Sequence, residues 1–415
     1  MRILLIHQNF LEKDDSGGSR FNEMVKIWSE LGHKVTVLCG MVHYSSGVKN
    51  EKYKGKFIYR EIYSENVMVI RSHVSEAYNA NFMGRLWAYF SFMFSSLVAG
   101  LVYARNKNDL ILASSPPLFV GISALLLSRI KKIPFVFEIR DLWPESAIDT
   151  GVLRNRSIIR LSFWFERFIY NKSIRINVLT PAFQDILISQ KNITPQKIFL
   201  IPNAADFSIS DSILENFDRN TFRKEHNLND KFVIIYVGAH GVANHLIQLI
   251  ETAEIVKGSN VMFLSIGSGM QKQFLINEVA KRNLTNIKFL DPVPKSEVFK
   301  FIMASDAGAS ILKKTETFKT VLSNKTFDYM ACKRPIFMLI DGISHDLVEK
   351  ANCGYYVLPE NPEDFAQKIN KMLDLNTDQR LELGHNGYVF AKKYYDRKTL
   401  AKEYINKLEK LTEKK

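Results

Sequence analysis

The sequence predicts an α/β protein with two doubly wound domains, each built on a mostly parallel sheet. Three observations lead to this class. Short apolar runs alternate with helix-length periodic segments from end to end, and this pattern occurs in each half of the chain. With 415 residues, 46% of them hydrophobic, the chain also exceeds the size of one hydrophobic core.

The apolar runs of the first half have the length and composition of buried parallel strands. Between the first two runs, Gly17-Gly18-Ser19-Arg20 opens a helix. Gly32 should end that helix, because glycine readily adopts the left-handed conformation found after many helices. The six predicted strands are residues 3–6, 35–38, 67–70, 110–113, 135–138 and 176–179.

The second half repeats the pattern after a turn-rich segment, Ile201-Pro202-Asn203. We therefore expect an N-terminal domain of residues 1–203, a C-terminal domain of residues 204–386, and a C-terminal helix, 387–415, that crosses back to the first domain. A deep cleft between two such domains is where strand ends of both sheets can face one ligand. The five predicted strands are residues 232–238, 261–267, 287–290, 307–312 and 335–340.

A long uncharged segment, residues 86–104, lies between Arg85 and Arg105 and has the length of a membrane-spanning helix. It leads directly into a predicted strand, so a buried helix, or one lying along a membrane surface, is the expected arrangement. A second apolar helix, residues 118–130, follows and would extend an apolar flank on the first domain.

One segment, residues 153–175, carries +5 of the net charge of +13. There six Arg or Lys and one Glu are interleaved with aromatic and aliphatic residues, a composition that suits an anionic membrane surface. The alternative is a solvated basic face over an ordinary core stripe. Nucleic acid is not expected as a partner, because no recognisable nucleic-acid-binding motif accompanies the charge.

The three cysteines lack Cys-x-x-Cys spacing, which favours a reducing compartment over a disulfide framework and gives no support to a structural zinc site. The apolar run at the N-terminus is too short for a signal peptide and is predicted to be the first strand. The expected location is therefore the cytoplasm, peripheral on the inner face of the cytoplasmic membrane.

Residues 323–331 have the pattern of a helix start suited to a nucleotide diphosphate. Ser323 or Asn324 can cap the helix, whose N–H groups and dipole favour an anion, and Lys325 adds a positive charge there. Asp328 shares a face with Lys325 and could accept hydrogen bonds from a ribose diol. The alternative is an ordinary capped amphipathic helix.

Glycine-rich turns follow three predicted strands, at Gly17-Gly18, Gly238-Ala239-His240-Gly241 and Gly267-Ser268-Gly269. Glycine lets a backbone approach a bound group closely, and His240 could contact phosphate. The turns match neither the dinucleotide fingerprint nor the P-loop. After another predicted strand, the backbone near Val293 could read the edge of a base.

The fifth predicted strand of the first half ends in an ionisable cluster, residues 138–145. Carboxylates at the C-terminal end of a parallel strand are candidate acid or base groups, and Trp143 offers a face for a sugar ring. The alternative is a surface pair of Arg140 with one of the carboxylates. The ionisable residues are Glu138, Arg140, Asp141 and Glu145.

Together these motifs resemble the retaining glycosyltransferases of family 4, which have the two-domain GT-B fold, and the similarity extends over essentially the whole chain. Residues 140–146 and 236–241 resemble in particular the WbuB-like N-acetylfucosamine transferases of bacterial O-antigen or capsule assembly. The resemblance implies that Lys325 faces the donor phosphate and Asp328 holds the ribose, as the second Glu of the family's Glu-x7-Glu motif does.

The sequence departs from the family pattern at two places. Thr320 stands where the first motif Glu is expected, and Glu316 is near enough in sequence to replace it. An Arg and a Lys expected after Gly241 are also missing. The expected catalytic residues are Asp141, Glu145 and Lys325, and the expected donor-site residues are Gly17, Gly18, Gly238, His240, Gly241, Gly267, Val293, Glu316, Thr320, Ser323, Asn324, Lys325 and Asp328.

The resemblance implies hexosyl-type transfer, with retention, from a nucleotide diphosphate sugar onto a lipid-linked saccharide for surface polysaccharide. The donor is expected to be UDP-N-acetyl-fucosamine or similar, bound by the second domain, with the acceptor on the first. No Asp-x-Asp occurs, so no metal or other cofactor is expected. The alternatives are a UDP-sugar 2-epimerase-like enzyme and a non-catalytic sugar-nucleotide-binding scaffold.

Overall fold

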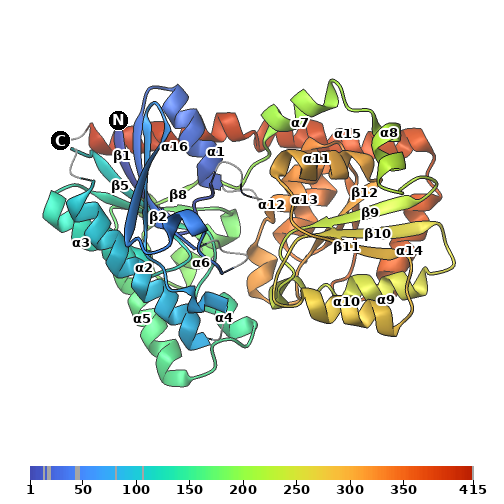
Figure 1. Cartoon of the computed structure of the whole chain (residues 1–415), viewed down its shortest axis with the longest axis horizontal. Helices are drawn as coiled ribbons and strands as arrows, with labels where there is room; N and C mark the ends of the chain where they lie inside the picture. Colours follow the sequence, from blue (N-terminus) through green and yellow to red (C-terminus); the bar gives the residue numbers. More distant parts are fainter. Residues whose placement is uncertain (13–14, 16–19, 43–46, 80–81, 105–106, 414–415) are drawn as a thin grey trace. The chain divides into compact units, whose positions relative to one another are not determined.

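The computed structural model describes residues 1–12, 15, 20–42, 47–79, 82–104 and 107–413. The chain folds into two compact units, each with its own sheet and covering helices (Figure 1). The first unit comprises Met1–Glu12, Ser19–Pro202 and Lys398–Lys415, and the second consists mainly of Asn203–Arg397.

The first unit contains an eight-stranded sheet in the order β3-β4-β2-β1-β5-β6-β7-β8. All neighbouring strands are parallel except β3 and β4, which form an antiparallel edge. The central strand β1 is buried because its apolar residues pack on both faces. The strands are β1 (Arg2–Ile6), β2 (Lys34–Gly40), β3 (Ile58–Ser64), β4 (Val67–Ser72), β5 (Leu110–Ser115), β6 (Phe135–Ile139), β7 (Arg175–Val178) and β8 (Ile198–Leu200).

Helices cover both faces of this sheet (Figure 1). The first helix is followed by Gly32, whose φ of +84° is the left-handed conformation that the sequence predicted for its end. The helices between the strands are α1 (Arg20–Glu30), α2 (Phe82–Val102), α3 (Val120–Lys131), α4 (Glu145–Asp149), α5 (Arg156–Lys172) and α6 (Pro181–Ser189), and short 3-10 turns lie at Glu51–Tyr53, Glu76–Asn79 and Pro195–Lys197.

The second unit contains a six-stranded, fully parallel sheet in the order β11-β10-β9-β12-β13-β14. Alternate residues of β9 enter two apolar layers: Val233 and Ile235 pack on one side, Ile234 and Tyr236 on the other. The strands are β9 (Phe232–Val237), β10 (Val261–Ile266), β11 (Ile287–Leu290), β12 (Ala307–Ile311), β13 (Ile336–Leu339) and β14 (Gly354–Tyr356).

Nine α-helices accompany this sheet within the described residues. They include α12, the predicted candidate helix, and α15, which is the last helix of the unit. They are α7 (Phe207–Leu214), α8 (Arg219–Glu225), α9 (Ile247–Ile255), α10 (Lys272–Lys281), α11 (Lys295–Ala304), α12 (Asn324–Ala331), α13 (Ile343–Ala351), α14 (Pro362–Leu373) and α15 (Thr377–Tyr394).

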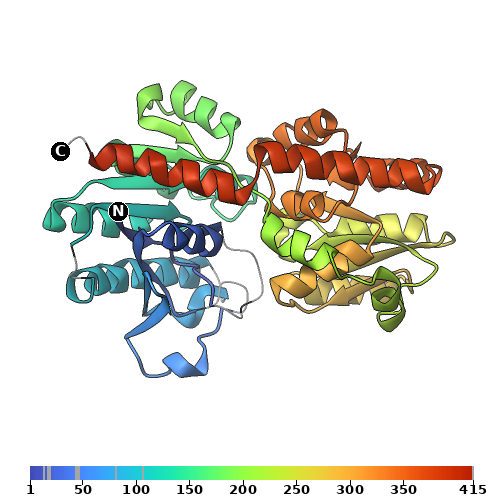
Figure 2. The ribbon, with the colours of Figure 1, turned by 90° about the horizontal axis from the view of Figure 1, so that it is seen from above.

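The C-terminal segment is two helices rather than the single pattern predicted from residue 387. Gly387 lies inside α15, and α16 (Arg397–Thr412) begins after a break. The break occurs because Ala205 forms backbone hydrogen bonds with Tyr395 and Arg397, which takes those residues out of a helical ladder. From Lys398 onward the chain belongs to the first unit, and Figure 2 shows α16 in red along it.

Helix α2 confirms the long apolar helix predicted over residues 86–104. Its Met83–Val102 segment is long and apolar enough to cross a membrane by length and composition, and 33% of its most apolar window is buried. The inner face is anchored by hydroxyl groups: Ser95 donates to the carbonyl of His73 at 2.6 Å, and the Ser96 and Ser123 hydroxyls lie 3.0 Å apart. The helix therefore packs on the sheet along one face only.

Candidate active site

The start of α12 lies at the C-terminal end of β9, held there by Tyr329. The Tyr329 hydroxyl accepts from the Val237 N–H at 3.1 Å and donates to the Ala309 carbonyl at 3.2 Å. Its ring needs the space left by Gly308, where a Cβ would lie 2.4 Å from the ring. The helix is thus fixed against two neighbouring strands.

Ser323 occupies the N-cap position of α12, but its side chain makes no capping hydrogen bond, contrary to the sequence-based expectation. Asn324 is already helical, and within the described residues its buried Oδ1 has no hydrogen-bond partner. Phe327 and Met330 are buried, as an amphipathic helix requires. The Thr326 N–H donates to the Ser323 carbonyl at 3.2 Å, so the first-turn N–H groups that remain for a ligand are those of Asn324 and Lys325.

Lys325 extends from this helix start over the ring of Tyr236, with Nζ 4.8 Å from the ring centroid. It also passes Gly238, where an added Cβ would lie 3.2 Å from Cε. The side chain is half-buried, and burial lowers the pKa of Lys325 to about 8. In the part of the chain that the structure describes, its ammonium makes no hydrogen bond or ion pair. Such a cation is suited to an anionic ligand.

Asp328 lies one turn after Lys325 on the same helix and is half-buried. Its charge acts to raise the pKa of Lys325, although less than burial lowers it. The structure thus brings these two predicted residues together, as their spacing implied.

His240 is fully buried in the turn after β9, with Nε2 2.9 Å from the Ser265 hydroxyl. Burial, with smaller contributions from Lys272 and Lys325, lowers the pKa of His240 to about 4, so the ring is neutral near pH 7. If the Ser265 hydroxyl donates to Nε2, Nδ1 carries the proton. Nδ1 has no partner within the described residues and would be a free donor.

The two glycine turns of the second unit pack directly on each other. A Cβ at Gly267 would lie 1.9 Å from the Gly238 carbonyl oxygen, and one at Gly269 would lie 2.5 Å from the His240 carbonyl oxygen. Both glycines have positive φ, +155° and +153°. These positions therefore require glycine, and their contact fixes His240.

Lys272 is a member of this site that sequence reasoning missed. Its ammonium donates to the carbonyls of Gly267 and Leu290, at 2.9 and 2.8 Å, and to Asp291 Oδ1 at 2.6 Å. It holds the second glycine turn to the end of β11. A lysine that opens a helix three residues after a Gly-Ser-Gly turn was the signal that could have found it.

The remaining predicted donor-site residues have other contacts, directly follow His240, as Gly241 does, or lie outside the described residues. Thr320 donates its hydroxyl to the Thr317 carbonyl, and the Glu316 side chain is 85% exposed and pairs with Lys319 at 2.6 Å. Val293 is half-buried against the core, and Gly241 precedes a 3-10 turn at Val242–Asn244. Gly17 and Gly18 lie outside the described residues.

In the first unit, the carboxyl ends of β1 and β6 bring together His7, Arg140 and Asp141. Arg140 Nη1 lies 3.4 Å from His7 Nε2, and burial together with this cation keeps the pKa of His7 well below its usual value. Asp141 Oδ2 accepts from the Ser146 hydroxyl at 2.8 Å. Burial and the nearby charge of Glu145 raise the pKa of Asp141 to about 6. His7 was not predicted.

The other two carboxylates of this segment are engaged. Glu138 is fully buried, 3.2 Å from Arg20 and 2.8 Å from the Asn177 amide nitrogen. Glu145 begins α4, and its Oε1 lies 2.6 Å from the Lys191 ammonium. Asp141 is therefore the better candidate to meet a ligand.

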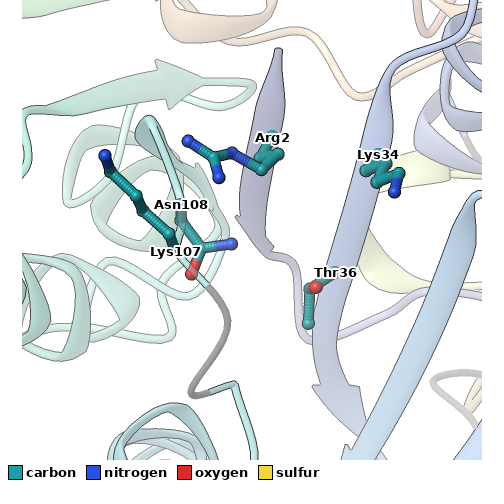
Figure 3. Close-up of a pocket in the computed structure, with 5 residues that line it drawn as sticks. All are labelled: Arg2, Lys34, Thr36, Lys107 and Asn108. Carbon is teal, nitrogen blue, oxygen red and sulfur yellow. The ribbon is translucent and has the colours of Figure 1, made fainter.

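A cavity of about 300 Å³ lies at the opposite edge of the same sheet. Figure 3 shows Arg2 on β1, Lys34 and Thr36 on β2, and Lys107 and Asn108 just before β5. These positions are at the N-terminal ends of the strands, whereas His7 and Asp141 follow the C-terminal ends. Arg2 is already paired with Asp109 at 2.6 Å. This cavity is therefore separate from the candidate site.

Helices α2 and α5 share an exposed apolar surface. The ring of Phe119 lies 4.5 Å from that of Phe90 on α2 and 5.3 Å from that of Phe165 on α5. Exposed arginines flank the aromatic groups, at positions 154, 156, 160 and 167. The large exposed side chains are Met83, Trp87, Phe90, Phe94, Leu101 and Val102 on α2, and Ile158, Leu161, Phe163 and Trp164 on α5.

Two family models match the chain and between them cover most of it. Residues 17–204 match the Glycosyl transferase 4-like domain, and residues 218–390 match the Glycosyl transferases group 1. The protein is a glycosyltransferase with the GT-B fold. The two matches together support the resemblance to glycosyltransferase family 4 and confirm the predicted fold class, whereas retention and the WbuB-like subgroup stay predictions.

Relatives of known name are distant. The chain is 22% identical over 335 residues to an Escherichia coli (strain K12) protein named as the colanic acid biosynthesis glycosyl transferase WcaI, covering 80% of this chain and 81% of the relative. It is 21% identical over 291 residues to WbjE of Pseudomonas aeruginosa, named as a glycosyltransferase, covering 69% and 70%. The name of the first relative refers to colanic acid biosynthesis, and that of the second refers to glycosyl transfer alone.

Solved structures share the fold over the whole chain. Sucrose-phosphate synthase of Thermosynechococcus elongatus matches with a TM-score of 0.78, 14% identity and 100% coverage of both chains. HepE of Anabaena in complex with UDP and glucose matches with a TM-score of 0.70 and 16% identity, covering 99% of this chain and 100% of HepE. At these identities the likeness shows the fold alone.

Proposed function

We propose that this glycosyltransferase moves a sugar, with retention, from a UDP-linked donor such as UDP-N-acetyl-fucosamine onto a lipid-linked saccharide during O-antigen or capsule assembly. The observation that carries the donor assignment is the Lys325 ammonium, which makes no ion pair within the described residues and lies at an uncapped helix start near neutral His240. The solved complexes of HepE with UDP-glucose and of a trehalose-6-phosphate enzyme with a UDP-fluoroglucose support a UDP donor.

In this proposal the departing diphosphate carries the charge that develops in the transition state. Lys325, the first-turn N–H groups of α12 and the His240 Nδ1–H would stabilise it, while Asp328 binds the ribose. The leaving phosphate oxygen can itself take the acceptor proton on the same face, so retention needs no enzymic nucleophile. Because Lys325 and the helix supply positive charge, the proposed mechanism uses no metal or other cofactor.

The proposed acceptor binds to the first unit, where Asp141 orients its hydroxyl groups. Its ionised form accepts hydrogen bonds, and the Ser146 hydroxyl already holds one carboxylate oxygen. The exposed aromatic and basic surface of α2 and α5 supports a lipid-linked acceptor and a peripheral position on the inner face of the cytoplasmic membrane.

Substitution of Lys325 tests the donor assignment. Lys325→Met should lower kcat/KM for UDP-sugar turnover about 100- to 1,000-fold, as removal of one group that stabilises developing negative charge does. Lys371→Met is the matched control, because Lys371 is exposed on α14 and its ammonium also lies over a tyrosine ring, 4.9 Å from the centroid of Tyr355 on β14. Near wild-type turnover by Lys325→Met at limiting donor would refute the assignment.

A second candidate function is a non-catalytic sugar-nucleotide-binding scaffold. It is favoured by the residues at the positions where a carboxylate for the donor sugar was expected. Thr320 cannot supply a carboxylate, and Glu316 is exposed and paired with Lys319. The experiment is a comparison of UDP-sugar binding, measured by calorimetry, with hydrolysis and transfer, measured as released UDP. Binding without turnover across UDP-sugars and acceptors would support the scaffold and refute the enzyme.

A further inference from the structure

Three charged side chains from separate elements of the first unit meet in its interior. The Lys191 ammonium lies 2.6 Å from Glu145 Oε1 and 2.6 Å from both carboxylate oxygens of Glu166. The side chains of Lys191 and Glu166 are 9% and 2% exposed. One ammonium therefore uses its three donors to join α4 to α5.

The positions of Lys191 and Glu166 are both fixed by their surroundings. Lys191 follows α6, and its backbone N–H donates to the Ile186 carbonyl at 3.2 Å. Its ammonium also lies 5.4 Å from the ring of Phe163 on α5. Glu166 is hydrogen-bonded to Tyr170, one turn further along the same helix. The ammonium cannot move without breaking contacts to two helices.

Stability alone is a weak explanation for this cluster. Removing an ammonium and two carboxylates from water costs much of what their attraction returns, so apolar side chains of similar size often serve as well. Well-packed charge clusters do, however, impose a tight geometry on the elements that carry them. The question is which element needs that geometry.

The turn that carries Glu145 also holds the proposed acceptor carboxylate. Ser146 follows Glu145 directly, is 9% exposed, and donates its hydroxyl to Asp141 Oδ2 at 2.8 Å. Its N–H donates to the Leu142 carbonyl at 2.9 Å. A displacement of Glu145 would therefore move Ser146 and, through it, Asp141.

We propose that Lys191 is a positioning residue for sugar transfer. By binding Glu145 and Glu166 together, it holds the first turn of α4, and with it Asp141, at a fixed place against α5. This inference rests on the proposed function, in which Asp141 orients the acceptor. It also ties Asp141 to the helix whose outer face carries the exposed aromatic and basic residues.

The first experiment compares Lys191→Met with Lys197→Met in the full-length protein. Lys197 also contacts α5, but its ammonium donates to the backbone carbonyl of Asn171 at 2.9 Å. The assay measures UDP released from UDP-N-acetylhexosamines with a short-chain polyprenyl-diphosphate monosaccharide as acceptor. We expect Lys191→Met to lower kcat about 10- to 100-fold with little change in donor KM, as displaced positioning groups do, and Lys197→Met to have no effect.

A second variant distinguishes a loss of positioning from a loss of the folded protein. This control is needed because Lys191→Met leaves two carboxylates without their cation. Lys191→Met/Glu166→Gln removes one of those charges and should melt near the wild-type temperature while keeping the loss in kcat. Lys191→Arg should restore part of the rate, since it keeps the charge with a different geometry. A wild-type kcat in the folded double variant would overturn the inference.

A double-mutant cycle separates positioning from a general structural role. If Lys191 acts through Ser146, Lys191→Met should cost little in a Ser146→Ala background, because Asp141 is already released there. Losses in kcat that multiply would overturn the inference while leaving the proposed function intact. A wild-type protein that binds UDP but transfers nothing would overturn the proposed function and this inference together.

Discussion

Lys325 and Lys371 both place an ammonium over a tyrosine ring, 4.8 and 4.9 Å from the ring centroids. Lys371 is exposed on α14, where water solvates its charge. Lys325 is half-buried at the start of α12, and burial lowers its pKa to about 8. The two cation–ring contacts are similar, but their surroundings differ. The contact of Lys371 is therefore an ordinary surface contact, whereas Lys325 is a candidate anion-binding residue.

Raising the pH should lower kcat/KM for the donor, and this loss should begin at a lower pH than it would if Lys325 had the usual pKa of a lysine. The pKa of Lys325 is lowered, so the ammonium that binds phosphate is present below about pH 8 and is lost above it. We expect kcat/KM for the donor to fall about tenfold per pH unit beyond that pKa. Lys325→Arg should remove this alkaline limb, since arginine stays charged, and Lys371→Arg should keep it. A wild-type profile that stays flat well above pH 8 would contradict the assignment.

The acid limb of the rate profile should report Asp141, whose pKa is raised to about 6 by burial and by Glu145. The Ser146 hydroxyl, the Leu142 N–H and Arg140 act in the opposite direction. Glu145→Gln removes a negative neighbour, so it should lower the pKa of Asp141 and move the acid limb to lower pH. Ser146→Ala removes a hydrogen bond to the carboxylate and should move it to higher pH. Shifts of equal sign in kcat/KM profiles would exclude Asp141 as the titrating group.

At the scale of elements, every strand predicted from an apolar run is present, and among the described residues three further strands were missed. β3 is an antiparallel edge strand in which Arg60 and Glu61 interrupt the apolar residues: Arg60 is exposed, whereas Glu61 pairs with the buried Arg71 at 2.9 Å. β8 and β14 have three residues each, too few to stand out from a loop. A buried parallel strand can be predicted from its own apolar run, whereas an edge strand or a very short strand forms only because neighbouring strands pair with it.

The same distinction applies to the candidate site. Lys325 and Asp328 could be predicted because the spacing of one helix places them together. His7 meets Arg140 across 133 positions, and Lys191 meets Glu145 across 46, so no local pattern announces either contact. The absence of a capping hydrogen bond from the Ser323 side chain could not be predicted either, because serine is a favoured N-cap residue.

The surface formed by α2 and α5 should bind anionic vesicles. Each basic residue near such a membrane contributes about 1 kcal/mol, so Arg156→Glu/Arg160→Glu should lower vesicle partitioning at least about tenfold at low salt. Lys257→Glu, an exposed change on the second unit, should have no effect. Co-sedimentation measures the bound fraction. Binding that is insensitive both to the two arginine substitutions and to salt would show that this surface does not bind the vesicles.

Trp164→Ser should weaken the same binding through lost apolar contact, because the Trp164 side chain is 62% exposed on α5. Phe274→Ser on α10 is the control, since Phe274 is 49% exposed on the second unit. Unlike the arginine effect, the Trp164 effect should persist at high salt. Equal loss with both variants would indicate non-specific adsorption.

At the scale of the whole molecule, the first unit is closed by a helix that follows the second unit in the chain. The chain leaves at Pro202 and returns at Lys398. Arg20 lies near both points: its guanidinium donates to the Ile201 carbonyl at 2.7 Å and lies 5.9 Å from the Tyr404 ring on α16. Trp28 donates to the Ala401 carbonyl at 2.8 Å. The stability of the first unit therefore depends on α16.

Substitutions in α16 and α15 should consequently destabilise different units. Tyr404 is fully buried on α16, so Tyr404→Ala should destabilise the first unit by about 3–5 kcal/mol. Tyr388 on α15 packs on Phe207, with ring centroids 5.1 Å apart, and its replacement by Ala should destabilise the second unit.

UDP identifies the transitions in calorimetry, because a ligand stabilises the unit that binds it. Tyr404→Ala should lower the UDP-insensitive transition and leave the Kd for UDP unchanged, whereas Tyr388→Ala should lower the UDP-sensitive one. A single transition that both variants shift equally would show that the units unfold together and that α16 does not serve the first unit alone.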